Sequence, residues 1–494
     1  MSSREHTLVH ELLAVAITLL TCTPVLGQVR KIGPEFQVNS FTTYIQGQPR
    51  VESLGRNSFL IVWLGSRPDL SEGYGIRGQL FDRRSGPKGG EFRVSTSGTT
   101  DDRSEQYPAL ARTGKAGFVV AWERYRALDD VAIGAERLSA DGLSLIGGVS
   151  VNTSGTREKR PSVASDPAGN FVVAWITGSN VGGYAPRVRV RNFSADGTPV
   201  TDEQMLTLAD RNSRDVNVAM RADGSSITVW QEDGAGIVGQ RRDETGTPTG
   251  PVFTASLTGD RHPDIALTSR GSFVVVWQTY GKDGSGYGVF GRRFDRAGAA
   301  QSDEFQVNTY TPDQQGLPSI AANTKGEFVV VWESYVSPFQ QEGGQDGDGR
   351  GIFGQYFAAD GDRIGGEFQV NTFFHGNQGN RRVRESDVAI WPDGNFVAAW
   401  TSPEQDGDSD GVFAQSFSVD ESLGPVCGDA ANSDLLIRSK DALAVLHASL
   451  GTIPCELCIC DGDQSGDITT SDALAFLRLS VGAPITPSCP PCTR

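Results

Sequence analysis

The chain has 494 residues and a formal net charge of −16, from 44 Lys and Arg against 60 Asp and Glu. This length is too great for one small domain and allows a large buried core. The acidic balance repels phosphate backbones and so argues against nucleic acid as a partner.

Residues 1–27 have the pattern of a secretory signal peptide. An apolar stretch runs from Leu12 to Leu26, and Gly27–Gln28 is a suitable cleavage point. No other apolar run approaches the ~18 residues that a membrane span needs, so we expect a secreted protein of bacterial type without a membrane span. The alternative is a lipoprotein acylation site at Cys22, in "LLTC".

One apolar strand pattern recurs through the next 370 or so residues. Its copies are "FLIVW", "FVVAW", "FVVAW", "SITVW", "FVVVW", "FVVVW" and "FVAAW", ending at Trp63, Trp122, Trp175, Trp230, Trp277, Trp332 and Trp400. Runs of β-branched and aromatic residues, entered through tight glycine turns such as "PDGN", predict buried strands.

Three companion strands share this period. A segment such as "YPALAR" or "HPDIAL" precedes each tryptophan strand, one such as "GIFGQYFA" follows it, and one such as "EFQVNT" comes last. Four strands in each of seven repeats predict a mainly β fold, a seven-bladed β-propeller over residues 35–420. The chain enters this region with an unpaired "EFQVNS" (Glu35–Ser40), whereas the last repeat stops after its third strand, so we expect the N-terminal strand to close the last blade.

The long loops after the tryptophan and "QVNT" strands are expected to share one face of the disc, where a glycan or protein ligand would bind. In one of them Asp406, Asp408 and Asp410 alternate, a spacing with which carboxylate oxygens can wrap Ca²⁺. The alternative is a β-turn rich in Asp and Gly. "GDSDG" at 407–411 matches G-x-S-x-G but lacks the strand–turn–helix context of a nucleophile elbow.

A twelve-residue acidic loop, "DGDQSGDITTSD", begins at Asp461 and is followed by an amphipathic helix pattern. EF-hand spacing predicts a calcium site with the ligands Asp461, Asp463, Ser465, Asp467, Thr469 and Asp472. The helix pattern also occurs 31 residues earlier, after a degenerate loop that retains Asn432, Asp434 and Asp441 as ligands of a weaker second site.

These two loop–helix units resemble a type I dockerin over about residues 426–494. The resemblance implies a small α-helical module, within 421–494, that folds with calcium and docks onto a cohesin-like or other surface protein. It also implies that the residues at loop positions 10 and 11 help to choose the partner, namely Ser439, Lys440, Thr470 and Ser471. The degenerate first loop and the cysteine-bearing inserts depart from the dockerin pattern.

Six cysteines lie in this same region: Cys427, Cys455, Cys458, Cys460, Cys489 and Cys492. An even number in one small module of an exported protein predicts up to three disulfides, with the pairing left open. The alternative is a zinc site, because two pairs have C-x-x-C spacing.

The leading functional hypothesis is therefore a secreted calcium-binding protein whose propeller recognises a ligand and whose tail attaches it to a partner. The second is a polysaccharide-degrading enzyme, a glycoside hydrolase or lyase, because dockerins usually accompany such enzymes. A hydrolase would require two carboxylates about 5 to 10 Å apart in the central funnel. A structural exoprotein without a soluble ligand is the third possibility.

Overall fold

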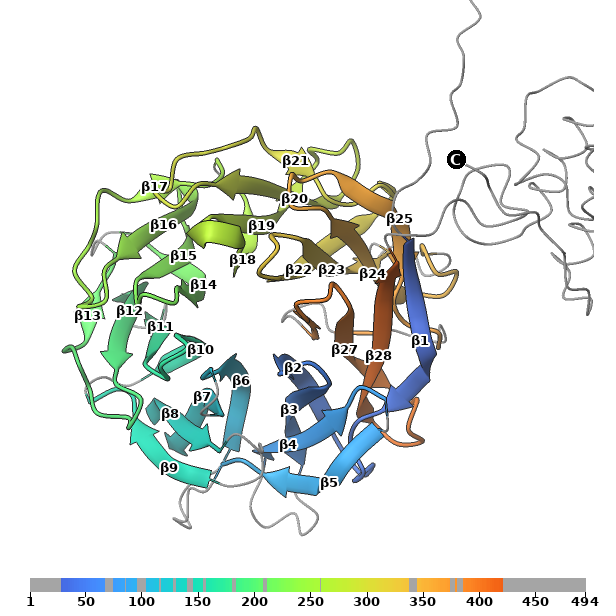
Figure 1. Cartoon of the computed structure of the whole chain (residues 1–494), viewed down its shortest axis with the longest axis horizontal. Coiled ribbons are helices and arrows are strands. Elements are labelled where there is room, and N and C mark those ends of the chain that lie inside the picture. The colour runs from blue at the N-terminus through green and yellow to red at the C-terminus, as the bar shows by residue number, and fades with distance from the viewer. Residues whose placement is uncertain are drawn as a thin grey trace, which may run out of the picture. The chain divides into compact units, whose positions relative to one another are not determined.

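The computed structural model describes residues 28–66, 74–84, 86–95, 104–114, 117–127, 130–139, 145–153, 157–179, 184–207, 211–257, 259–336, 344–373, 378–379 and 385–420. They form seven four-stranded antiparallel sheets arranged around a central axis (Figure 1). The predicted seven-bladed β-propeller is confirmed. The predicted signal peptide and the dockerin-like module lie outside the described residues.

Blades 1 to 4 follow one another along the chain. Blade 1 comprises β2 (Gln46–Leu54), β3 (Ser58–Ser66), β4 (Tyr74–Asp82) and β5 (Gly86–Arg93). Blade 2 comprises β6 (Ser104–Arg112), β7 (Phe118–Ala127), β8 (Asp130–Leu138) and β9 (Leu145–Ser150). Blade 3 comprises β10 (Glu158–Ser165), β11 (Phe171–Ser179), β12 (Tyr184–Phe193) and β13 (Gln204–Met205). Blade 4 comprises β14 (Ser213–Met220), β15 (Ser226–Glu232), β16 (Gly236–Arg242) and β17 (Phe253–Thr254).

Blades 5 to 7 complete the ring. Blade 5 comprises β18 (Arg261–Leu267), β19 (Phe273–Tyr280), β20 (Tyr287–Phe294) and β21 (Phe305–Gln306), with the 3-10 turn η1 (Ser269–Gly271) between its first two strands. Blade 6 comprises β22 (Gln314–Ala322), β23 (Phe328–Tyr335), β24 (Arg350–Phe357) and β25 (Arg363–Gln369). Blade 7 comprises β26 (Ser386–Ile390), β27 (Phe396–Pro403), β28 (Asp410–Asp420) and β1 (Gln28–Gln37).

The N-terminal strand closes the ring, as the sequence predicts. β1 pairs antiparallel with β28 from Gln28 opposite Asp420 to Gln37 opposite Phe413, with a bulge between Ile32 and Phe36. The strand therefore begins before the expected Glu35–Ser40 segment. Because the first and last strands share one sheet, separating blade 7 from blade 1 would break a ladder of backbone hydrogen bonds.

The tryptophan strands form the cores between blades. All seven of their tryptophans are at most 3% exposed, and each core cluster draws its apolar side chains from two neighbouring blades. In five blades the first phenylalanine of the core strand stacks on a phenylalanine of the third strand, as Phe59 does on Phe81 with ring centroids 5.1 Å apart. Each blade therefore buries its faces only against its neighbours, as in other repeat folds.

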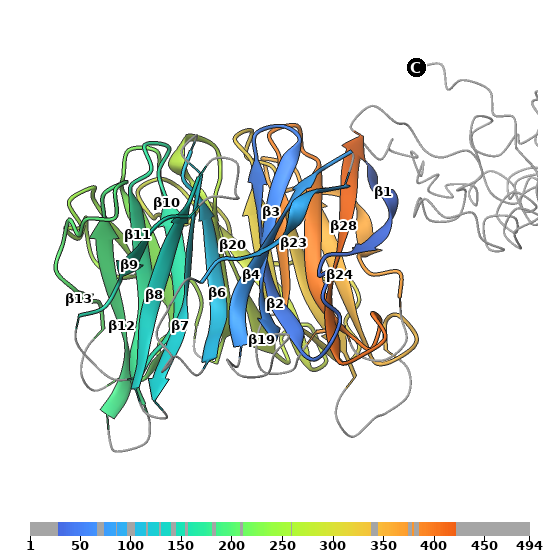
Figure 2. The same ribbon diagram turned by 90° about the horizontal axis from the view of Figure 1, so that it is seen from below.

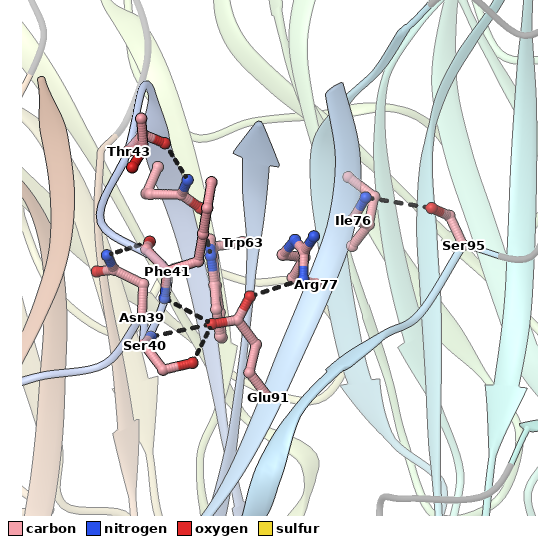
Figure 3. Close-up of polar contacts among 10 residues, drawn as sticks. Asn39, Ser40, Phe41, Thr43, Trp63, Ile76, Arg77, Glu91 and Ser95 are labelled. Atoms are coloured by element: carbon pink, nitrogen blue, oxygen red, sulfur yellow. Dashed lines mark hydrogen bonds and ion pairs between the residues drawn. The ribbon is translucent and has the colours of Figure 1, made fainter. Parts of the chain in front are cut away.

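Glutamates in or beside the outer strands latch adjacent blades together at the rim. At the seam between blades 7 and 1, the Glu91 carboxylate accepts hydrogen bonds from the Ser40 amide and hydroxyl, both at 2.9 Å (Figure 3). Its other oxygen pairs with Arg77 at 2.9 Å. Equivalent glutamates bind the residue after "VN" of the preceding blade at three other seams; these are Glu203, Glu367 and Glu35.

The strands run along the axis between two faces of the disc (Figure 2). Tight turns connect the first to the second strand of each blade, as at Asp166–Asn170, and we call this side the short-turn face. The opposite side, the long-loop face, carries the connections from second to third strands and from each blade to the next. The arrangement matches the one expected from the sequence.

Candidate functional site at the mouth of the central tunnel

The inner strands of all seven blades enclose an axial cavity of about 510 Å³, which we call the tunnel. The register of each inner strand against its tryptophan strand defines equivalent positions around the ring. Three levels of side chains follow from it: a mouth level at the long-loop face, a middle level and an inner level near the short-turn face. A concave pocket of this size on a rigid scaffold is the default place for a ligand.

The mouth level is built on a repeated backbone bulge. In six inner strands the pairing register shifts at one point, and a non-glycine residue there has φ between 49° and 56°. These residues are Gln48, Tyr107, Arg160, Asp215, His262 and Leu317. Bulges re-aim side chains, and a positive φ is unfavourable for such residues unless the surroundings hold it. Since the bulge recurs in six blades, it belongs to the scaffold, and only the side chain that it presents differs.

Buried side chains of the neighbouring blade hold several of these bulges in place. The residue after the core tryptophan serves this purpose in blades 2 and 5: Glu123 accepts the Arg160 amide at 2.7 Å, and Gln278 accepts the Leu317 amide at 2.8 Å. Across the seam, the Gln48 side chain accepts the Tyr107 amide at 2.8 Å. An unsatisfied amide at these buried positions would be destabilising, so these acceptors fix the mouth residues.

Four consecutive blades bring Tyr107, Arg160, Asp215 and His262 together at the mouth. His262 donates its Nδ1–H to Oδ2 of Asp215 at 3.1 Å, and the other Asp215 oxygen pairs with Arg160. The Arg160 guanidinium also lies over the Tyr107 ring, 5.9 Å from its centroid. The result is a continuous row of an aromatic hydroxyl, a cation, a carboxylate and an imidazole.

The electrostatics of this row follow from its contacts. Burial acts to raise the pKa of Asp215, but His262 and Arg160 outweigh it and hold that pKa well below the ordinary range. Burial also acts to lower the pKa of Arg160, and the nearby Asp215 carboxylate reverses this so that the pKa is raised. Burial, with Glu123 nearby, raises the pKa of Tyr107, so its hydroxyl keeps its proton. Asp215 is therefore an anion, Arg160 a cation and Tyr107 a proton donor.

Glu123 lies behind this row. It is only 1% exposed, and besides the Arg160 amide it accepts the hydroxyl of Tyr125 at 3.0 Å. Burial raises the pKa of Glu123 from an ordinary 4.5 to about 7, against the opposing effect of these two hydrogen bonds. Its charge therefore changes near neutral pH, directly beneath the backbone that carries Arg160.

The inner level contains six alanines and one glutamate. The alanines are Ala111, Ala164, Ala219, Ala266, Ala321 and Ala389, and Glu52 occupies the same position in blade 1. Burial and the nearby Asp387 carboxylate raise the pKa of Glu52 to about 8. Small side chains keep this end of the tunnel open, and the single glutamate is a neutral acid there at pH 7.

The other tunnel carboxylates are occupied by structural hydrogen bonds. Asp264 accepts the Ile320 amide at 3.0 Å. Asp387 accepts the Val51 amide at 2.9 Å and the Ser319 hydroxyl at 2.7 Å. With Asp215 held by Arg160 and His262, a neutral acid and a nearby carboxylate, the combination that glycoside hydrolysis uses, are found at Glu52 and Asp387, below the mouth and not in the row.

The predicted Asp406 and Asp408 lie in the loop before β28, and Asp410 is the first residue of that strand. Asp406 accepts the Asn39 side-chain amide at 3.0 Å, and Asp408 accepts the Tyr44 amide at 2.9 Å. Burial and the nearby Asp406 raise the pKa of Asp410. Over the described part of the chain, no group of three or more His, Cys, Asp or Glu side chains is arranged to hold a metal ion. The predicted calcium ligands, partner-binding residues and cysteines of 421–494 lie outside the described residues.

The mouth residues were not selected by sequence reasoning, although a signal for them exists. Five of the inner segments share an X-Pro pair, in "QPRVES", "YPALAR", "RPSVAS", "HPDIAL" and "LPSIAA", and X is the residue that the bulge presents at the mouth. A constant proline beside a variable residue at the innermost strand marks a scaffold position with a changing side chain. Asp215 lacks the proline, so only its register identifies it.

No known protein family and no curated protein matches the chain. Among solved structures, a protein of unknown function from Dyadobacter fermentans is 10% identical, covering 66% of this chain and 98% of its own, with a TM-score of 0.46. The polysaccharide lyase Uly1 is 12% identical over 79% of this chain and 99% of its own, with a TM-score of 0.44. The α-L-arabinanase of Penicillium chrysogenum is 11% identical over 79% and 98%, with a TM-score of 0.41. These distances assign the chain to no family. Among the described residues, no helix has the length and apolar character of a membrane span.

Proposed function

We propose that the propeller binds a uronate-containing polysaccharide at the tunnel mouth and cleaves it by β-elimination. The observation that supports this is the row formed by Tyr107, Arg160, Asp215 and His262, which combines a proton donor, a cation and a carboxylate-bound imidazole at one site. Each of these groups has a role in elimination next to a carboxylate, and the row contains no second free carboxyl for hydrolysis.

The chemistry assigns one role to each side chain. The Arg160 guanidinium binds the uronate carboxylate and stabilises the negative charge that develops on it. His262, whose Nδ1–H is donated to Asp215, takes up the proton of the adjacent ring carbon at Nε2. The electron pair of that C–H bond forms a C=C bond as the neighbouring C–O bond breaks, and the Tyr107 hydroxyl gives its proton to the leaving oxygen. No water is consumed.

Asp215 acts as a positioning residue in this scheme. Its ionised carboxylate orients the imidazole and stabilises the imidazolium that forms when His262 takes the proton. Because the same carboxylate also binds Arg160, it fixes the cation and the base at a constant separation. A neutral side chain at position 215 would leave both groups in place without this coupling.

The two ends of the chain complete the proposal from sequence motifs alone. Residues 1–27 would export the protein, and the 421–494 module would bind calcium and attach the propeller to a cohesin-like or other surface protein. Attachment near a polymer suits an enzyme of this kind, since effective concentration rises when catalyst and substrate are held together.

The test is to incubate the full-length protein with polygalacturonate, alginate, hyaluronan and other soluble uronates. Elimination produces a conjugated C=C bond with strong ultraviolet absorbance, whereas hydrolysis produces reducing ends without it. We expect the absorbance to rise, and His262→Ala and Arg160→Ala each to reduce the rate by about 10²-fold or more. Arg296→Ala, on the short-turn face, is the matched control. Reducing ends without absorbance would replace the proposal by hydrolysis, and binding without any product would reduce it to recognition.

A further inference from the structure

Tyrosine is distributed very unevenly between the two faces. Of the ten tyrosines, nine occupy strand ends or loops on the long-loop side: Tyr44, Tyr74, Tyr107, Tyr125, Tyr184, Tyr280, Tyr287, Tyr310 and Tyr335. Only Tyr356 lies toward the short turns, where the stacked phenylalanine pairs also lie. Tyrosine combines an apolar ring with a polar hydroxyl, so its concentration on the face with the tunnel mouth indicates a surface adapted to amphipathic ligands.

One position on the core strand is occupied by a tyrosine in three blades. The third residue after the core tryptophan is Tyr125 in blade 2, Tyr280 in blade 5 and Tyr335 in blade 6. Two of them have internal roles: Tyr125 donates its hydroxyl to Glu123 at 3.0 Å, and the Tyr335 ring lies 4.4 Å from the buried Arg350 guanidinium. Tyr280 instead is 69% exposed. The fold therefore does not explain why blade 5 keeps a large aromatic ring at this position.

The exposed ring is held in a defined orientation. Tyr280 and Tyr287 pack edge to face, with centroids 5.2 Å apart and an interplanar angle of 75°. The Tyr287 amide donates to the Gln314 side chain at 3.0 Å, which ties this pair to blade 6. The short loop between the two tyrosines closes through the Gly281 amide and the Gly286 carbonyl at 2.6 Å. Two rings on adjacent strand ends thus form a fixed platform.

The border of this platform is polar. Next to it, the partly exposed Lys282 pairs with Glu304. An apolar protein surface docking here would remove these charges from water without replacing their hydration. A sugar ring fits better, because its C–H face packs on the tyrosine while its hydroxyls reach the charged groups at the edge.

The platform belongs to the same blade as His262. Gln278 of β19 pairs with Arg261 of β18. Tyr280 lies two residues after Gln278, and His262 follows Arg261 directly, so both are close to this strand pair. Two residues of extended strand span roughly 7 Å, about the length of one or two sugar units. A polymer chain entering the mouth at His262 can therefore reach the platform directly.

We infer that Tyr280 and Tyr287 form an accessory sugar-binding subsite that holds a pyranose unit of the polysaccharide whose cleavage point lies at the mouth. This inference rests on the proposed function, since that function supplies the chain that spans both places. It assigns the platform to binding alone: it contributes to affinity for long chains and takes no part in the elimination itself.

The test compares Tyr280→Ala and Tyr280→Phe with the wild-type full-length protein on long uronate polymers and on the shortest oligosaccharide that is cleaved. We expect Tyr280→Ala to raise KM for the long polymer about 3- to 10-fold with kcat unchanged, and to leave KM for the shortest substrate as it is. Tyr280→Phe keeps the ring and should stay within about twofold of wild type. The control is Tyr44→Ala, which removes another exposed ring from the same face.

Every outcome decides one of the two proposals. Unchanged KM for the long polymer, or an equal rise for the shortest substrate, overturns the subsite and leaves the elimination proposal standing. If no uronate is bound but a neutral glycan from an array is bound in a Tyr280-dependent manner, the subsite holds and the proposed function fails. If the wild-type protein binds no glycan at all, both fail.

Discussion

The exchange of Glu123 and Gln278 tests how the mouth backbone is held. The two side chains occupy the same position in blades 2 and 5, directly after the core tryptophan, and each accepts the amide of a bulge residue in the next blade. One acceptor is ionisable and the other is not. Glu123→Gln should therefore retain the hydrogen bond to Arg160 and remove a pH dependence, while Gln278→Glu should introduce one.

The magnitude follows from the raised pKa. A group with a raised folded-state pKa contributes stability that is present below its unfolded value and lost as the pH rises through the folded value. For Glu123 this stability is lost between pH 4.5 and about pH 7. Between pH ~5 and pH ~8, ionisation of Glu123 should lower the free energy of unfolding of the wild-type protein by about 2 to 3 kcal/mol relative to Glu123→Gln.

The assay is urea denaturation followed by tryptophan fluorescence, since all seven core tryptophans are buried. Midpoints of wild type, Glu123→Gln and Gln278→Glu are measured at several pH values across this window. As the pH rises, the denaturation midpoint of Glu123→Gln should increase relative to that of wild type, and the midpoint of Gln278→Glu should decrease relative to it. A wild-type to Glu123→Gln difference that is constant with pH, or that changes in the opposite direction, would refute the reasoning that burial dominates at this position.

Two further predictions concern ring closure and the tail. Glu91→Ala removes the acceptor of the Ser40 amide and hydroxyl and the partner of Arg77 at the closing seam, so we expect a loss of about 1 to 3 kcal/mol, measured as a lower denaturation midpoint; an unchanged midpoint would show that β1–β28 pairing alone closes the ring. Asp461→Ala removes the first ligand of the predicted calcium loop, so isothermal titration of the full-length protein, stripped with EDTA, should show the loss of one calcium-binding event; equal uptake by both proteins would contradict the predicted site.

Most of the fold could be predicted because its determinants are local and repeated. The period of "FVVAW", its alternation with three companion segments and the complementary ends at Glu35–Ser40 and Gly411–Ser418 were enough for blade number, strand number and closure. The rim latch could not be predicted in the same way. Each outer-strand glutamate and the residue that it binds lie about 50 or more positions apart, or at opposite ends of the propeller, and only the ring brings them together.

The sequence by itself determined that seven similar sheets would form and that variable loops would share one face, because strand periodicity and turn chemistry act over a few residues. Only the tertiary structure decided which side chains meet at the mouth. Tyr107 and His262 are 155 positions apart, and the proline that follows each of them marks a strand position but does not indicate which side chains meet. Their proximity arises from backbone bulges repeated around a common axis, and the direction in which a bulge presents its side chain depends on hydrogen bonds from the neighbouring blade.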